Sequence, residues 1–550
     1  MSCVTIVHFG REPGVSVDYD PQSGRSLQVK HRIALLRNVA LVAVAGYVEA
    51  AVGLAVGVMI ARTLGPADYG HYAFAIWLCG MLVMVGNNAM PTSSIKFIAE
   101  ARGSEQPGTA AALAHRLAQL QTASSALVLS IFVLLMLFKP IDEWYRNLPL
   151  MLGITVVAVW ARAGFWMRGA VGKGFERFKP EAVALACTAF LNVVLVGLLA
   201  WKHGTVIQFF AVYAILGLFA NLTVRILLRR DSVPIAPGTI PDGVKLRLRA
   251  HVMLTGLLML LTAFTTRAVE MTLLKLFESA EVVGYFAIAA ALTKGAVDLL
   301  AGGMSAVLLP AMARRYGKGG KGSLASMFRE STRLYWFLGL AVAGLGFTVS
   351  EGIVHLLYGS RYDAAIPAVM WNLAIAGLML VNGAAAAVLT ASDRQVDRIR
   401  VVLYTFALNI ALGLYLIPRY GLSGAIASYG ISQLFETVFA WWYAGRLTQL
   451  RIDYGTLSRI ALAALIATAL SHATTRLLHV QLAFLGGATV FLLTYFTLSV
   501  VFRTWRASDF ETIASVVSRA GRFGNGLSER LLKWQRFALP EPMPAERGLS

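Results

Sequence analysis

The stretch of sequence that decides the fold occurs twice. The first copy is Leu64-Gly-Pro-Ala-Asp-Tyr-Gly-His-Tyr-Ala-Phe-Ala75, and the second is Phe277-Glu-Ser-Ala-Glu-Val-Val-Gly-Tyr-Phe-Ala-Ile-Ala289. Gly70 of the first copy aligns with Gly284 of the second. Each copy follows a long apolar run, and six helices separate them. Because six is even, both copies face the same side of a membrane, so we expect two parallel repeats related by an axis along the membrane normal.

Apolar runs surround both copies, and a helix that spans a membrane needs about 20 mainly apolar residues. The sequence predicts an all-α polytopic membrane protein with about 14 transmembrane helices, arranged as two six-helix lobes in parallel repeat plus two extra C-terminal helices. The runs are 39–61, 71–95, 117–138, 148–167, 182–201, 205–224, 252–274, 282–309, 334–350, 364–390, 401–417, 421–445, 460–475 and 480–502.

The composition agrees with this class. Of the 550 residues 57% are apolar and 14% charged, whereas soluble domains carry about 25% charged residues. A mean hydropathy of +0.65 excludes a water-soluble enzyme and a disordered chain. The three cysteines, Cys3, Cys79 and Cys187, have no near neighbours among themselves, so we expect neither a metal site nor a disulfide.

The basic residues give the orientation. If the N-terminus is cytoplasmic, 39 of the 49 Lys and Arg residues fall on the cytoplasmic side, eight on the opposite side and two inside helices. This asymmetry predicts cytoplasmic termini. The net charge of +20 is spread over many short loops rather than one aromatic-bearing face, so we expect no nucleic-acid partner.

These patterns divide the chain into six parts. A linker that contains Pro234, Pro237 and Pro241 separates the two halves. The predicted parts are a cytoplasmic N-terminal tail (1–36), an N-lobe (37–230), a cytoplasmic linker (231–249), a C-lobe (250–447), two further spanning helices (456–502) and a cytoplasmic basic tail (503–550).

Four glycine-rich loop segments carry a family resemblance. Residues Ala61–Gly70 resemble the first periplasmic loop of Wzx-like flippases for O-antigen and exopolysaccharide, which belong to the MATE/MurJ-type superfamily. Val283–Ala287, Leu357–Tyr362 and Tyr420–Ala425 agree with that pattern. The resemblance covers roughly residues 37–502, and its motifs identify the superfamily better than the substrate.

The resemblance implies a secondary-type transporter of the bacterial inner membrane, not an enzyme. Its expected substrate is a polyprenyl-pyrophosphate-linked oligosaccharide, moved from the cytoplasmic to the periplasmic leaflet by alternating access. Membrane lipids are expected partners, and so is the polysaccharide polymerase machinery. The coupling ion, a proton or sodium if one is needed, stays open. No Gly-x-x-x-x-Gly-Lys-Ser/Thr loop for ATP is present, and we expect no cofactor.

Charged residues at membrane depth are the candidate site residues, because a charge at mid-bilayer costs about 2.5–3.5 kcal/mol on insertion scales. Arg267 and Glu270 are three residues apart, and Lys294 and Asp298 are four apart, which places each pair on one face of a regular helix. Two interpretations stay open. Either each pair neutralises itself and fixes packing, or Arg267 and Lys294 attract the pyrophosphate of a substrate.

Three more charges complete the candidates. Arg162, placed near the cytoplasmic end of its run, is a further substrate-binding candidate, although such an arginine can also snorkel to the interface. Glu49 lies about 15 Å into the first run and has no basic neighbour on its helix. It is the first candidate for ion coupling, with a hydrogen bond to another helix as the alternative. Glu436, Glu270 and Asp298 are the other ion-coupling candidates.

Competing functions are a lipid II flippase and a MATE-type ion-coupled exporter of small cations. Fourteen helices and basic residues in the seventh and eighth runs argue against the cation exporter. A membrane-embedded polymerase or ligase needs large periplasmic loops, and the longest predicted loop on that side has about nine residues.

Overall fold

The computed structural model describes residues 46–141, 144, 147–319, 323–392, 394–449, 453–477 and 480–506. Within these residues the secondary structure is helical and contains no strand. The predicted N-terminal tail and the basic tail beyond residue 506 lie outside the described residues. Thirteen described segments are long and apolar enough to cross a membrane, which agrees with the predicted fold class.

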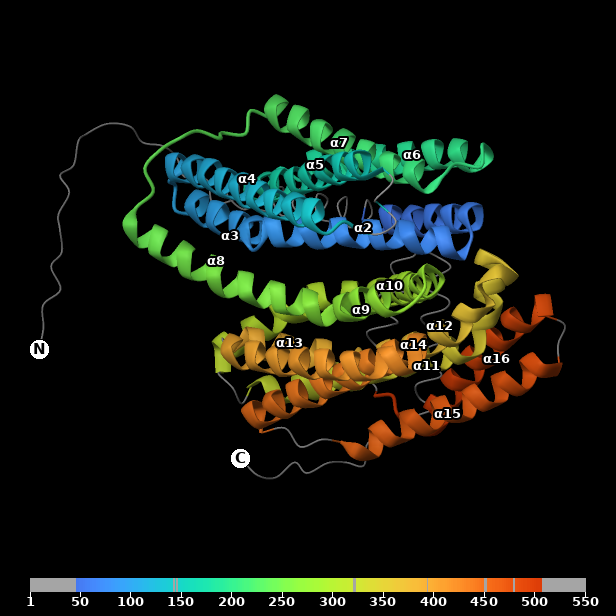
Figure 1. Ribbon diagram of the computed structural model, residues 1–550. Helices are drawn as coiled ribbons and strands as arrows, with labels where there is room; N and C mark the ends of the chain where they lie inside the picture. The colour runs from blue at the N-terminus through green and yellow to red at the C-terminus, as the bar shows by residue number, and fades with distance from the viewer. Residues whose placement is uncertain are drawn as a thin grey trace, which may run out of the picture.

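The first half of the chain forms one bundle of helices (Figure 1). Several of these helices begin with a proline in the first turn, where the missing N–H costs nothing. The helices are Gly46–Leu64, α2 (Pro66–Asn87), α3 (Met90–Gly103), α4 (Pro107–Phe138), α5 (Leu148–Gly174), α6 (Lys179–Trp201) and α7 (Val206–Arg230).

The second half forms another bundle beside the first, and the last two helices pack on its outer side (Figure 1). Its helices are α8 (Asp242–Ala263), a π-helical turn (Phe264–Ala268), α9 (Val269–Phe277), α10 (Ala280–Gly319), α11 (Leu324–Tyr358), a 3-10 turn (Ser360–Ala365), α12 (Ile366–Met379), α13 (Asn382–Ala391), α14 (Gln395–Thr448), α15 (Tyr454–Leu477) and α16 (Val480–Val501).

Helix α14 accounts for two of the predicted spans. Its 54 residues would extend about 81 Å as one straight helix, far more than a bilayer core of about 30 Å. Gly421 has a positive φ of 54°, and Pro418 lies just before it. The left-handed conformation, which favours glycine, breaks the helix there. Counting the two halves of α14 separately turns the thirteen segments into the fourteen predicted from the sequence.

The run 71–95 forms one span as expected, but its C-terminal bound is wrong. Helix α2 ends at Asn87, and α3 begins at Met90. Asn88 has a positive φ of 47°, and Pro91 stands in the first turn of α3, where it cannot donate to the preceding turn. The apolar end of the run therefore belongs to a separate short helix that packs on α4 and α5.

The two copies of the repeat touch each other. A Cβ atom added to Gly284 would lie 2.6 Å from the carbonyl oxygen of Pro66, and one added to Gly70 would meet the carbonyl oxygen of Ala280. Pro66 and Ala280 are 214 residues apart, as are Gly70 and Gly284, so the contact is reciprocal. Reciprocal contacts arise around a twofold axis. Because the two loops meet, they lie on the same side, as parallel repeats require and inverted repeats do not.

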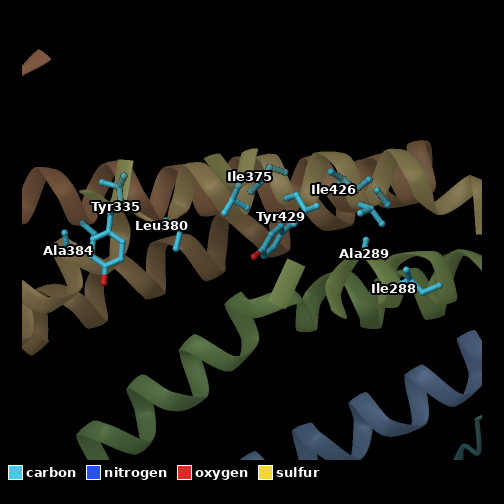
Figure 2. Close-up of a cluster of buried hydrophobic side chains, with 14 of the residues drawn as sticks. Ile288, Ala289, Tyr335, Ile375, Leu380, Ala384, Ile426 and Tyr429 are labelled. Carbon is cyan, nitrogen blue, oxygen red and sulfur yellow. The ribbon is translucent and has the colours of Figure 1, made fainter. Parts of the chain in front are cut away.

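A buried apolar cluster joins the first helix and α2 to the helices of the second half. Figure 2 shows part of it, with Tyr429, Ile375 and Ile426 above the helix that carries Ile288 and Ala289. By contrast, large apolar side chains on the outer faces, such as Phe138 and Leu465, are exposed. Such outward-facing apolar side chains are what a bilayer solvates.

Candidate functional site

A cavity of about 810 Å³ lies between α2 of the first half and the helices of the second half. Small side chains of α10, Ala287, Ala290 and Ala291, leave room for it. Two of the predicted substrate-binding residues line this cavity, Arg267 and Lys294. The structure thus brings together two cations that the sequence placed on neighbouring helices.

Arg267 lies in the π-helical turn Phe264–Ala268, and its φ of 67° is unusual for a residue with a side chain. Its Nη1 donates to the carbonyl oxygen of Ala290 at 2.6 Å, and its guanidinium lies 5.2 Å from the ring centroid of Tyr429. Backbone strain of this kind costs about 1–3 kcal/mol and clusters at functional sites. The turn holds the guanidinium at the cavity wall rather than along its own helix.

One of the two open interpretations was that Arg267 and Glu270 neutralise each other. The structure shows no ion pair between them, although Arg267 is close enough to act on the carboxylate. Glu270 is fully buried beside Asn409, without a hydrogen bond of normal geometry between them. Within the described part of the chain, no carboxylate lies within 4 Å of Arg267. The physical reason is the π-helical turn, because three-residue spacing brings side chains together only on a regular helix.

Lys294 lies on α10, on the same face as Ala287, Ala290 and Ala291. The ammonium group is therefore on the wall of the cavity that faces α2. The side chain of Asp298, its predicted partner, lies outside the described residues.

Five aromatic side chains also line the cavity, among mostly small and aliphatic ones, and the sequence analysis did not single them out. They come from both halves of the chain: Tyr69, Tyr72 and Trp77 from α2, Tyr335 from α11 and Tyr429 from α14. The close spacing of Tyr69 and Tyr72 in the first copy of the repeat was a signal for this lining. Tyr335 and Tyr429 have no local signal, because they reach the cavity only through tertiary packing.

Arg162 lies near the middle of α5, not near the end of a span as expected. Helix α5 continues to Gly174, so about 18 Å of helix lies beyond Arg162 on that side. Its guanidinium stacks 3.5 Å from the ring centroid of Tyr213, and its stem packs on Gly217. Such a contact is a cation–π interaction. Arg162 is thus held inside the first half at membrane depth, where snorkelling cannot explain it.

Glu49 projects from the first helix with an exposed side chain. The charged groups close enough to act on it are Arg162, Glu181 and Lys294. Glu49 therefore lies within electrostatic reach of a cation of each half. The sequence showed only that its own helix carries no basic neighbour.

Glu436 accepts a hydrogen bond from Nδ2 of Asn382 at 3.1 Å, and Asn382 lines the cavity. Arg398 is the nearest cation that acts on it. None of the residues that line the cavity is acidic, and Glu436 contacts the lining through Asn382.

A polar group inside the first half was missed in the sequence. Lys173 and the buried Glu181 form an ion pair at 2.8 Å, and Arg168 donates to Asn221. Arg168 and Asn221 line a separate cavity of about 240 Å³ between α4, α5 and α7. Because Lys173 and Glu181 fall where a span ends, their charges read as loop residues in the sequence.

The two halves are joined firmly where the repeat copies meet. Nε of Arg62 donates to the carbonyl oxygen of Leu357 at 2.6 Å, and the Tyr362 hydroxyl donates to that of Ala61 at 2.7 Å. Tyr69 packs edge-on against Tyr362 and also lines the cavity. Tyr69 thus connects these contacts to the cavity.

Two helical lobes around a central cavity are the architecture of the MurJ- and MATE-like membrane protein fold. The family model described as polysaccharide biosynthesis protein matches residues 35–315, and the chain belongs to that family. A search of curated proteins found no match.

Solved structures agree on the fold. The chain is similar to the lipid II flippase MurJ in an inward closed conformation, with a TM-score of 0.65 and 16% identity over 84% of this chain and 98% of that one. It is also similar to an inward-facing multidrug resistance MATE transporter, with a TM-score of 0.57 and 14% identity over 73% and 96%. A third similar structure is a Vibrio cholerae MATE transporter, with a TM-score of 0.53 and 15% identity over 76% of this chain and 96% of that one.

Proposed function

We propose that this protein is a flippase that moves a polyprenyl-pyrophosphate-linked oligosaccharide across the bacterial inner membrane by alternating access. The observation that carries the proposal is the central cavity, which is lined by Arg267 and Lys294 together with five aromatic side chains. Membership of the polysaccharide biosynthesis family supports a saccharide as part of the substrate.

The two cations suit the charged part of such a substrate. A pyrophosphate cannot enter hydrocarbon without partners, because its charges would lose their hydration. Arg267 and Lys294 offer fixed positive charge on neighbouring walls, and charge-assisted hydrogen bonds to phosphate oxygens are among the strongest in proteins. Tyr69, Tyr72 and Tyr335 would offer ring faces and hydroxyl groups to sugars.

Translocation follows from the contacts between the lobes. The Arg62 and Tyr362 contacts join the lobes beside the cavity, and alternating access would require them to break in one of the two states. The two repeat loops, which touch at Gly70 and Gly284, would then move apart. The lobes would turn about the bound substrate.

Glu49 is the proposed coupling group. Protonation of its carboxylate would remove a negative charge that attracts both Arg162 and Lys294 and so change the electrostatic balance between the lobes. We expect Glu49→Gln to keep the fold and to weaken the dependence of transport on the proton gradient. Full gradient dependence in this variant, measured in vesicles with and without an uncoupler, would assign Glu49 to packing. Glu270, Asp298 and Glu436 are the remaining candidates for a proton or sodium site.

Both termini are proposed to be cytoplasmic, on the basis of the 39-to-8 distribution of basic residues. We expect a reporter enzyme that works only in the cytoplasm to be active when fused after Arg503, and a reporter that works only in the periplasm to be inactive there. Activity restricted to a periplasmic reporter would overturn this orientation. Contact with the polymerase that consumes the exported repeat unit is part of the same proposal.

A strain that lacks the gene tests the substrate. We expect it to accumulate a polyprenyl-pyrophosphate-linked oligosaccharide on the cytoplasmic leaflet, detectable by extraction and mass spectrometry, and complementation should clear it. Accumulation of lipid II would favour the second candidate, a lipid II flippase, which the likeness to MurJ supports. Accumulation of neither compound would refute both.

A further inference from the structure

A second large cavity lies away from the central one, where the linker between the lobes crosses from α7 to α8. This linker groove has a volume of about 790 Å³ and lies between α4, the linker and α8. The linker follows α4 closely, because a Cβ atom at Gly238 would lie 3.1 Å from Cβ of Ala112. The groove is therefore bounded by one helix from each lobe.

The chemistry of the linker groove is divided between its floor and its rim. Buried Leu117 and Leu248, with the exposed Leu120, provide apolar surface. The rim carries His115, Arg116, Lys245 and Arg249, and no acidic residue lines the groove. Lys245 is paired with Asp242 at 2.9 Å, and both are exposed. Within the described residues no carboxylate pairs with Arg116 or Arg249, so these two charges are available to an anion.

The position along α4 places this rim at the level of lipid headgroups. Arg116 precedes Phe138, the exposed last residue of α4, by 22 residues, or roughly 33 Å of helix. A hydrocarbon core is about 30 Å thick. If Phe138 lies at one interface, Arg116 lies just beyond the other, and the apolar floor lies beside it.

We infer that the linker groove binds an anionic phospholipid of the cytoplasmic leaflet, with its phosphate between Arg116 and Arg249 and an acyl chain on the floor formed by Leu120 and Leu248. A soluble anion would match the rim but leave the apolar floor in water, which is why the observations favour a lipid. This site is separate from the central cavity and does not depend on the transported substrate.

A lipid in this groove would connect the lobes, because Arg116 belongs to α4 and Arg249 to α8. A ligand that bridges two moving bodies binds best to the arrangement that brings its contacts together, and it stabilises that arrangement in return. The anionic lipid content of the membrane would thus bias the position of the lobes.

The test measures thermal unfolding of the purified full-length protein in detergent, with phosphatidylglycerol, phosphatidylcholine or inorganic phosphate added. We expect only phosphatidylglycerol to raise Tm. The variant R116Q/R249Q should weaken its apparent affinity roughly 30-fold, since each basic residue near a membrane surface contributes to anionic lipid binding. The control R314Q/R315Q, which removes two exposed charges from α10, should keep the wild-type response.

A second variant keeps the result interpretable if R116Q/R249Q fails to fold. Leu120→Trp fills the groove while leaving its charges, and it should also weaken the response to phosphatidylglycerol. A wild-type response in whichever of these variants folds would overturn the site. An equal rise in Tm with inorganic phosphate would also overturn it, because the ligand would then be a free anion.

Discussion

The two lobes share a repeated sequence but differ at the cavity. Lys294 of α10 is 214 residues beyond Gly80 of α2, the same offset that relates Gly70 to Gly284. Gly80 follows Ile76 and Trp77 by one helical turn on the cavity face of α2, and the space around it is open. The second lobe thus carries a cation where the first lobe carries no side chain.

The helices that begin the two lobes differ in the same way. The helix Gly46–Leu64 is regular, whereas its counterpart in the second lobe is interrupted by the π-helical turn that holds Arg267. π-Helical turns inside α-helices are frequently found at functional sites. The comparison teaches that the repeat supplies the scaffold and that the charges of the cavity were placed in one copy only.

The largest expected effect comes from removing the cations that only the second lobe contributes to the cavity. Arg267→Ala and Lys294→Ala should each reduce export about 10- to 100-fold, since a hydrogen bond to a charged group contributes about 1.5–3 kcal/mol. Export is measured as surface polysaccharide at matched protein levels. Glu270→Gln should be milder, and Arg419→Ala, an exposed residue outside the cavity, should have little effect.

The packing alternative predicts a different pattern. If Arg267 and Glu270 act only on each other, the acid and base variants should be equally impaired, and the double variant Arg267→Ala/Glu270→Gln should largely recover. That recovery would leave the substrate site unlocated.

The second prediction concerns the reciprocal glycine contact. Gly284→Ala should destabilise the closed arrangement by about 1–3 kcal/mol, because the new Cβ atom would lie 2.6 Å from the Pro66 carbonyl oxygen. The measurements are Tm and the rate at which a cysteine introduced near Arg62 is labelled. We expect a lower Tm and faster labelling. Gly295→Ala, on the same helix but in open space, is the matched control and should be neutral or stabilising.

The third prediction sharpens the comparison by moving the charge. In the Lys294→Ala background, Gly80→Lys should restore part of the lost export, because it places an ammonium group on the opposite cavity wall. Gly80→Leu in the same background adds bulk without charge and should restore nothing. Equal activity of the two double variants would show that the position of the charge within the cavity matters more than its presence.

The smallest expected effect lies at an exposed ion pair between the lobes. Arg247 of α8 donates to both carboxylate oxygens of Glu100 on α3, at 2.7 and 3.1 Å. The hydrogen bond from Arg247 lowers the pKa of Glu100. Its contribution is therefore present above the ordinary pKa of a glutamate and is lost as pH falls through the lowered value. Glu100→Gln should lower Tm slightly at pH 7 and low salt, and this difference should vanish at high salt.

Much of the fold could be predicted because membrane solvation leaves a strong local signal. All fourteen apolar runs contribute to helices, since each must satisfy its backbone hydrogen bonds internally. The error at 71–95 arose because hydropathy does not register a helix break at Asn88 and Pro91. The repeat could be recognised from one short loop. The two copies of this loop pack on each other through their glycines, so both copies need a glycine there.

The site could be predicted only in part. Arg267 and Lys294 were visible because charges are rare at membrane depth. The π-helical turn was not, since regular spacing was assumed, and so the sequence could not show that Arg267 and Glu270 form no ion pair. Tyr335 and Tyr429 reach the cavity from helices distant in the sequence, and ordinary aromatic residues in apolar runs give no local sign of such a role.

The Gly70–Gly284 contact also constrains how such a chain can change over generations. Each glycine is held by the backbone of the other copy's loop, so the two duplicated segments form one unit of selection although 214 residues separate them. A mutation that bends either loop alters the space available to the glycine of the other. The rest of each half can differ, as the cavity walls do, but a change in this turn is tolerated only if the other copy leaves room for it.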